Sequence, residues 1–269
     1  MFTRQISLTF LGAVMAVSIW AGPALSQSTL EVVGTGDGID VMRALGKAFS
    51  AENKLVFVDI PPSIGSGGGI AAVGSGKSVL GRVARKLTDN ETALGLVYKP
   101  VALLPSAVFV NPNAGVSSLT TAQLANVFTG QIQNWKDVGG ADVRIRVVRR
   151  EDSDSTLTVL RTSMPGWKDL TITEKSKLAM TTQEAVASVR EVPGAIGFGP
   201  FSKDLEAGLT IVKIDGKYPT DDGYPSSATL ALIYSKTTVT PDAKTFVEFC
   251  ETKKAREIIA RLGSVPAQR

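Results

Sequence analysis

The stretch R-I-R-V-V-R-R-E-D-S-D-S-T-L-T-V-L-R, residues 144–161, predicts a β-strand that leads directly into the N-terminus of an α-helix. Ile145–Val148 is β-branched at three of its four positions, which is typical of a strand. Leu157 and Leu160 have the spacing of one helix face. A helix N-terminus carries about half a positive charge and free N–H groups, and Arg150 would bring guanidinium donors to it. These residues fit an anion-binding site, and they fit an ordinary capped helix beside surface arginines equally well.

The N-terminal 26 residues have the order of a secretory signal peptide. Arg4 is followed by an apolar run, Ile6–Ala21, and then by the small residues Ala24 and Ser26. We expect cleavage after Ser26, because small residues then occupy the −3 and −1 positions. The apolar run is too short for a good membrane span, and no cysteine near the cleavage site offers lipid attachment. The sequence therefore predicts a soluble exported protein.

Composition excludes several classes of function. The chain has no histidine, which removes Ser-His-Asp and Cys-His triads and histidine-ligated zinc. The net charge is only +4 and there is no long basic run, so we expect no nucleic-acid partner. Cys250 is the single cysteine, so no internal disulfide can form. It lies in a helical pattern with Phe246 and Phe249, and we expect it in the core.

Strands and helices alternate along the chain, which predicts an α/β fold. The expected strands include Leu30–Val33, Leu55–Ile60, Ala195–Phe198, Leu209–Ile214 and Thr229–Tyr234. The expected helices include one through Val41, Leu45 and Phe49, one over Thr120–Phe128 with a Thr120/Gln123 capping box, Thr182–Val192, and one long helix over Pro241–Leu262. Two apolar segments, Leu94–Tyr98 and Val101–Val110, are interrupted by Pro100 and Pro105, and we expect them to carry the chain from one domain to another.

Two glycine-rich turns follow predicted strands. Gly34–Ile39 lacks the third glycine of a dinucleotide fingerprint, since that position is Ile39. Pro61–Ser78 ends in a G-K-S sequence, but the first glycine of a Walker A loop would fall on Ala71. Both turns are better interpreted as strand-to-helix connections that expose backbone N–H groups to an anion, with Ser66 at the mouth of the second.

Four separated motifs resemble the phosphate-binding proteins of bacterial ABC importers, and they occur in the family's order from about residue 30 to the end of the chain. The matching segments are the G-S-G-G-G turn at 65–69, Leu119–Leu124 with Phe128 and the G-Q-I-Q-N-W sequence at 130–135, Arg149 and Arg150 followed by Thr156, and the G-A-I-G-F strand at 194–198.

The resemblance implies the type II periplasmic-binding-protein fold, in which two α/β lobes are joined by two crossing strands and hold the ligand in the cleft between them. Lobe one would comprise 27–103 with 230–269, and lobe two 104–229. Ser66 matches a hydroxyl donor, Arg150 the bidentate arginine and Thr156 the loop threonine. The full set of ligand-binding residues that the resemblance implies is Gly38, Ile39, Ser66, Gly67, Arg150, Asp154, Ser155 and Thr156.

The sequence departs from the family's pattern in three places, which involve four residues. Asp154 and Ser155 replace a Ser-Gly pair, Gly38 replaces a threonine, and Ala84 replaces the aspartate that accepts the proton of bound phosphate. Arg82 and Arg85 flank Ala84, which predicts a more cationic rim than in the family.

Asp154 has two interpretations. As a helix N-cap, its carboxylate would accept from the N–H of residue 156 or 157 and occupy part of the anion site itself. Alternatively, it compensates for Ala84 and accepts the proton of a protonated oxyanion, which would discriminate against sulfate. We favour the second interpretation, because Ser66, Arg150 and Thr156 are all retained as donors.

The resulting hypothesis is a periplasmic binding protein, not an enzyme, that captures phosphate or a related oxyanion for an inner-membrane ABC permease. We expect a monomer without cofactor or metal, not anchored by lipid. One alternative is an exported sensor of phosphate. Another is a phosphoester hydrolase on the same fold with Asp37 or Asp152 as nucleophile, which the absence of histidine disfavours.

Overall fold

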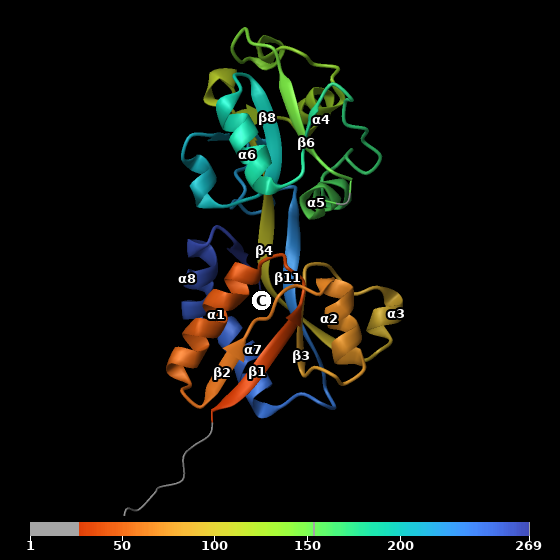
Figure 1. The fold of residues 1–269 in the computed structure, drawn as a ribbon, viewed down its shortest axis with the longest axis vertical. Coiled ribbons are helices and arrows are strands. Elements are labelled where there is room, and N and C mark those ends of the chain that lie inside the picture. Colours follow the sequence, from red (N-terminus) through yellow and green to blue (C-terminus); the bar gives the residue numbers. More distant parts are fainter. Residues whose placement is uncertain (1–26, 153, 269) are drawn as a thin grey trace, which may run out of the picture.

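The computed structural model describes residues 27–152 and 154–268, arranged as two lobes stacked along the long axis of the molecule (Figure 1). The predicted signal peptide lies outside the described residues. The protein has a mixed α/β structure in which strands from both lobes belong to one continuous sheet, ordered β2-β1-β3-β11-β4-β8-β6-β7. The predicted α/β fold is confirmed, and the two lobes meet at the middle strands of this order.

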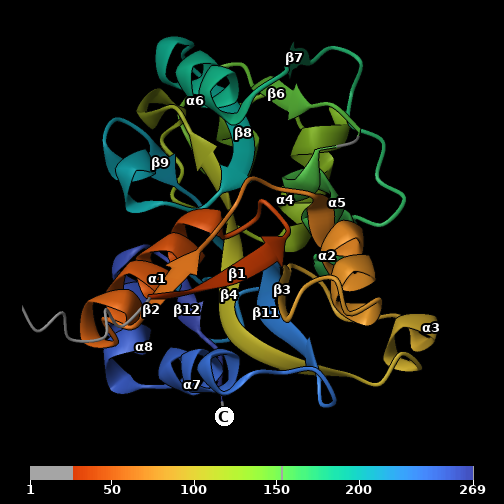
Figure 2. The same ribbon diagram turned by 60° about the horizontal axis from the view of Figure 1, so that its bottom comes forward.

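Lobe one is a mixed β-sheet with helices on both faces. Its strands β1, β2 and β3 pair in parallel, while β11 pairs antiparallel with β3. Helices α1, α7 and α8 pack on one face around a core containing Phe49 and Phe246, and α2 packs on the other (Figures 1 and 2). The elements are β1 Ser28–Gly34, α1 Ile39–Glu52, β2 Val56–Asp59, α2 Gly65–Gly74, β3 Leu80–Val83, α3 Asp89–Thr92, α7 Pro241–Cys250, α8 Lys253–Arg261 and β12 Val265–Pro266.

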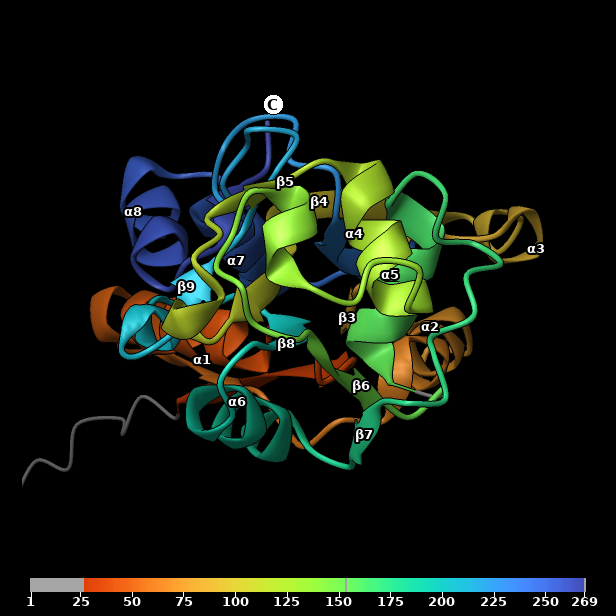
Figure 3. The same cartoon turned by 90° about the horizontal axis from the view of Figure 1, so that it is seen from above.

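Lobe two repeats this layering around β6 and β8, which pair in parallel. Helix α6 covers one face of these strands, and α4 and α5 lie on the other (Figure 3). Its elements are β5 Ser118–Leu119, α4 Thr121–Thr129, β6 Arg146–Arg150, α5 Ser155–Ser163, β7 Lys177–Ala179, α6 Thr182–Glu191, β8 Ala195–Pro200, β9 Thr210–Ile211 and β10 Lys213–Ile214, with 3-10 turns η1 Pro112–Ala114, η2 Trp135–Val138 and η3 Lys203–Glu206.

Two long antiparallel strands, β4 (Leu96–Val110) and β11 (Ser227–Ser235), connect the lobes (Figure 1). The expected interruption of β4 at its two prolines is wrong, because the strand continues through both. Pro100 pairs with Ala231, next to a register shift between Leu230 and Ala231. The irregular ladder there tolerates the missing N–H of proline.

We propose that the lobe boundaries fall inside these connecting strands, at 103/104 and 229/230. The apolar clusters support this division. Those of lobe one draw on residues up to Ala102 and from Leu230 onward, apart from the partly buried Leu104. Those of lobe two lie between Ala107 and Tyr224.

Two expected elements are each split in the structure. The long C-terminal helix is broken into α7 and α8, because the Thr252 hydroxyl accepts from the N–H of Ala255 at 3.2 Å and caps a new helix. The expected strand Leu209–Ile214 becomes β9, which pairs with β4, and β10, which pairs with β5. Cys250 is buried as expected, and burial raises the pKa of its thiol.

Candidate ligand-binding site

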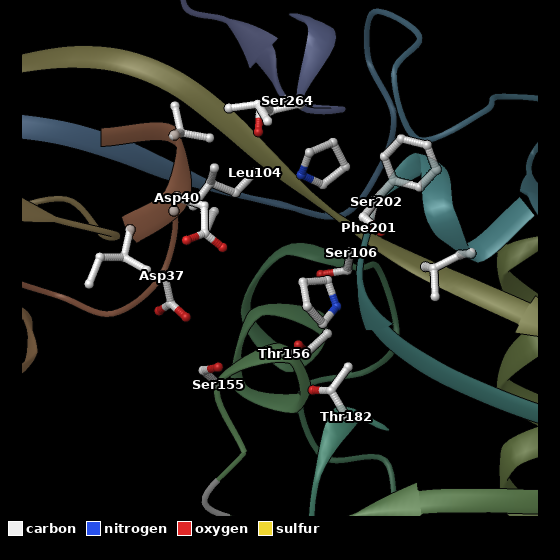
Figure 4. A pocket seen from close by; sticks show the side chains of 18 of the residues that line it. Asp37, Asp40, Leu104, Ser106, Ser155, Thr156, Thr182, Phe201, Ser202 and Ser264 are labelled. Carbon is white, nitrogen blue, oxygen red and sulfur yellow. The ribbon is translucent and has the colours of Figure 1, made fainter. Parts of the chain in front are cut away.

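A cleft of about 610 Å³ separates the lobes and is lined by residues of both. Figure 4 shows Asp37 and Asp40 of lobe one on one side of it, with Ser155, Thr156 and Thr182 of lobe two on the other. Many of the lining side chains carry hydroxyl groups. The polar lining residues are Asp37, Asp40, Ser106, Ser155, Thr156, Thr182, Gln183, Ser202, Lys203, Asp204, Arg261 and Ser264.

The lobe-one side of the cleft is the turn that leads into α1. Gly38 is the N-cap residue and has a φ of 68°, a left-handed conformation that favours glycine. It also faces Leu230 so closely that an added Cβ would come within 2.7 Å of that side chain. No side chain caps this helix end. The N–H of Ile39 donates to the carbonyl of Gly36 at 3.1 Å, so the N–H groups that this helix end leaves for the cleft are those of Asp40 and Val41, which also line it.

The lobe-two side is the N-terminus of α5, where Ser155 and Thr156 line the cleft. Asp154 is the N-cap residue of this helix, and its Oδ1 accepts from the N–H of Leu157 at 3.0 Å. Its Oδ2 accepts from Nε and Nη2 of Arg150 at 3.0 and 2.7 Å. Both side chains are buried, with 9% and 7% of their surface exposed. The carboxylate thus holds the same helix terminus and arginine that would bind an anionic ligand.

This ion pair changes the position of two predicted site residues. Arg150 also donates from Nη1 to the carbonyl of Ala179 at 3.2 Å, and neither Arg150 nor Asp154 is among the residues that line the cleft. The N-cap role considered for Asp154 is therefore present. Both carboxylate oxygens of Asp154 already accept hydrogen bonds within lobe two, Oδ1 from Leu157 and Oδ2 from Arg150. For Asp154 to accept the proton of a ligand, the ligand would have to reach one of these occupied oxygens.

Ser66 and Gly67 lie in the first turn of α2 and do not line the cleft. The hydroxyl of Ser66 accepts from the N–H of Ala84 at 3.1 Å and so ties α2 to the end of β3. The structure thus brings four predicted residues to the cleft, Gly38, Ile39, Ser155 and Thr156, while the other four are not part of its lining.

The two arginines beside Ala84 do not form the cationic rim that the sequence suggested, since neither lines the cleft. Arg82 is fully buried beneath the turn before α1. Arg85 is exposed and donates to both carboxylate oxygens of Glu91 at 2.7 and 2.8 Å. These hydrogen bonds, with that from the Thr88 N–H, lower the pKa of Glu91 to about 2 and raise the pKa of Arg85.

Several residues that line the cleft were not identified from the sequence. Ser106 lies on the connecting strand β4, and Thr182 begins α6, so a third helix N-terminus opens toward the cleft. A capping threonine directly before the Thr182–Val192 pattern was the available signal. Lys203 and Arg261 add cationic groups from lobe two and lobe one.

Metal and membrane features can be stated for the described part of the chain. Within residues 27–152 and 154–268, no group of three or more His, Cys, Asp or Glu side chains is placed to hold a metal ion. No helix in these ranges is long and apolar enough to cross a membrane.

Comparisons with known proteins agree with this architecture. A family described as "PBP superfamily domain" matches residues 21–252. The phosphate-binding protein PstS of Bacillus subtilis (strain 168) is 30% identical over 255 residues, which cover 91% of this chain and 83% of that protein. The PstS of Borreliella burgdorferi is 23% identical, over 67% of this chain and 69% of its own.

Solved structures give the same result. A putative phosphate ABC transporter substrate-binding protein from Clostridium perfringens, with bound phosphate, has a TM-score of 0.72 and 28% identity and covers 90% of this chain and 100% of its own. An ABC-type phosphate transport receptor from Vibrio cholerae has a TM-score of 0.72, covers 88% of this chain and 99% of its own and, at 23% identity, supports the fold alone. The chain belongs to the PBP superfamily and, within it, to the family of the phosphate-binding protein PstS, whose members are transport receptors and not enzymes.

Proposed function

We propose that this protein captures phosphate, or a closely related oxyanion, in the interlobe cleft and delivers it to an ABC permease. The observation that carries the proposal is that α1, α5 and α6 all begin at one cleft, from opposite lobes. Helix N-termini present N–H donors and partial positive charge, so their convergence suits a small anion. The phosphate bound in the Clostridium perfringens structure and the phosphate-binding Bacillus subtilis relative support the same class of ligand.

We propose that Gly38, Ile39, Ser155 and Thr156 contact the ligand directly. Ser66, Gly67, Arg150 and Asp154 would then contact it only after the lobes close and the Arg150–Asp154 pair opens toward the cleft. Ligand that binds both lobes favours the closed state by its differential affinity for that state.

Thermal unfolding with a panel of anions tests this function. A ligand present at about 100 times its dissociation constant should add about 2.7 kcal/mol to the free energy of unfolding. We expect phosphate to raise the melting temperature clearly, and sulfate, molybdate and sugar acids to raise it less, with arsenate as a close chemical analogue. An unchanged melting temperature with every oxyanion would exclude the proposal.

We further propose that the protein is a periplasmic monomer, released by cleavage after Ser26 and not anchored by lipid. Support comes from the charged, apolar and small-residue order of residues 1–26. N-terminal sequencing of the exported protein should therefore begin at Gln27. Recovery of exported protein that begins at Met1 would contradict cleavage, and a lipid-modified N-terminus would contradict the absence of an anchor.

A further inference from the structure

Arg82 is the most unusual buried residue of lobe one. It lies at the end of β3 with none of its surface exposed. No carboxylate among the described residues forms an ion pair with it, and its polar partners are three backbone carbonyls. Burial, and to a smaller extent the nearby Arg43, lower the pKa of its guanidinium. Arginine nevertheless keeps its proton in proteins, so this lobe encloses a positive charge without a counter-ion.

The three carbonyls belong to the ends of neighbouring strands. Nε donates to the carbonyl of Thr35 at 2.7 Å, Nη2 donates to Pro61 at 2.8 Å, and Nη1 donates to Val32. In return, the N–H of Thr35 donates to the carbonyl of Arg82 at 3.1 Å. One planar fork of donors therefore holds the ends of β1 and β2, from which the two glycine-rich turns depart.

The bond to Thr35 has an electrostatic consequence. The carbonyl of Thr35 and the N–H of Gly36 form one peptide group, and Gly36 lines the cleft. A charged donor on the carbonyl polarises this peptide group and makes its N–H a stronger donor, because hydrogen bonds in a chain reinforce one another. No partner for the Gly36 N–H occurs among the described residues.

The charges around the cleft explain why this polarisation matters. In lobe two, the charge of Arg150 is offset by Asp154 at 2.7 Å. In lobe one, Asp37 and Asp40 face the cleft (Figure 4) and would repel an anion. Arg43 Nη1 lies 3.8 Å from the Asp40 carboxylate and offsets part of that charge, and Arg261 also lines the cleft, but Asp37 has no cationic partner among the described residues. The only fully buried arginine of the described chain is thus placed behind the turn that carries one of these acids.

We infer that Arg82 is a positioning residue for the ligand and that it polarises the Gly36 amide. Its charge also gives lobe one a positive potential, whereas in lobe two the charge of Arg150 is offset by Asp154. This inference rests on the proposed binding of an anion in the cleft. Arg82 does not touch the ligand. It acts through the Thr35–Gly36 peptide group and through its uncompensated charge.

Titration calorimetry with inorganic phosphate on three variants tests the inference. Arg82→Lys keeps the charge and three donors, and should bind phosphate within about threefold of the wild type even if its melting temperature falls. Arg82→Gln removes the charge and should weaken binding by about tenfold or more. Arg85→Gln, which removes the same charge from an exposed site in the same lobe, should change affinity by less than about threefold.

Equal weakening in Arg82→Lys and Arg82→Gln would overturn the inference, because it would show that Arg82 only clamps the strands. Wild-type affinity in Arg82→Gln would overturn it as well. If Arg82→Gln fails to fold, the lysine variant alone decides between the two roles. Arg82→Lys should lose phosphate affinity if Arg82 only holds the strands together, and should keep it if Arg82 acts through its charge.

A measurement without ligand separates this inference from the proposed function. In the ligand-free protein, the amide-proton resonance of Gly36 should move upfield in Arg82→Gln and stay near the wild-type position in Arg82→Lys. If the wild type binds no phosphate, the proposed function is rejected, but the Gly36 resonance still shows whether Arg82 polarises the Gly36 amide. An unchanged Gly36 resonance in Arg82→Gln would overturn the inferred polarisation.

Discussion

Replacing Arg150 by alanine should weaken phosphate binding by about 3 kcal/mol, or roughly a hundredfold. The substitution leaves the Asp154 carboxylate, which is 7% exposed, without the guanidinium that binds its Oδ2. An uncompensated negative charge would then stand at the N-terminus of α5, where the ligand is proposed to bind. Stability should fall as well, by about 3 kcal/mol or more, since breaking a buried ion pair strands one charge.

Calorimetry and chemical denaturation measure the two effects separately. Arg149→Ala is the control, because side chains alternate along β6 and Arg149 faces away from Arg150. We expect it to bind phosphate within about threefold of the wild type. If Arg150→Ala itself stays within about threefold, the assignment of Arg150 to the site is wrong. The double variant Arg150→Ala/Asp154→Ala should recover part of the lost affinity, since it also removes the stranded carboxylate.

Replacing Asp154 by asparagine should strengthen anion binding by about tenfold, and the gain in affinity should be larger for sulfate than for phosphate. Asparagine keeps an N-cap acceptor of similar strength, so α5 should remain intact. The change frees the charge of Arg150, which now pairs with Asp154 Oδ2. A carboxylate accepts from a protonated phosphate but only repels sulfate, so its removal should narrow the difference in affinity between the two anions.

The matched control is Asp152→Asn, which removes the same charge from a side chain that is 79% exposed and paired with Arg161. It should leave both affinities nearly unchanged. An Asp154→Asn variant with wild-type affinities for both anions would contradict the electrostatic role. Rejection of both anions by the wild type, with binding of both restored in Asp154→Gly, would show instead that Asp154 only blocks the site.

Local sequence signals predicted the elements with strong caps and clear periodicity. The capping box of Thr120 and Gln123 is present, with mutual hydrogen bonds of 3.1 and 2.9 Å. The break before α8 was missed because the apolar pattern continues across Thr252. The only local signal for a new helix there is the Thr252 hydroxyl, which accepts from the N–H of Ala255. The continuity of β4 was missed because a strand tolerates proline at irregular or terminal pairing positions, and these depend on the partner strand, which is unknown from local sequence.

The sequence indicated which turns would line the proposed site, but not which side chains would form ion pairs beside it. Resemblance placed the ligand at the turns before α1 and α5, where the cleft lies. The engagement of Arg150 by Asp154 depends on side-chain rotamers across the start of a helix, which no periodicity records. The burial of Arg82 depends on three carbonyls, two of which lie 47 and 50 residues away in the chain.

The connection between the lobes has a mechanical consequence. Within residues 27–152 and 154–268, only the strands β4 and β11 carry the chain between the lobes, and a chain with one cysteine cannot form a disulfide across the cleft. An anion that contacts both lobes would therefore stabilise their closed arrangement by noncovalent contacts alone. Opening and closing would then need no covalent bond to be reduced and re-formed in each cycle of delivery.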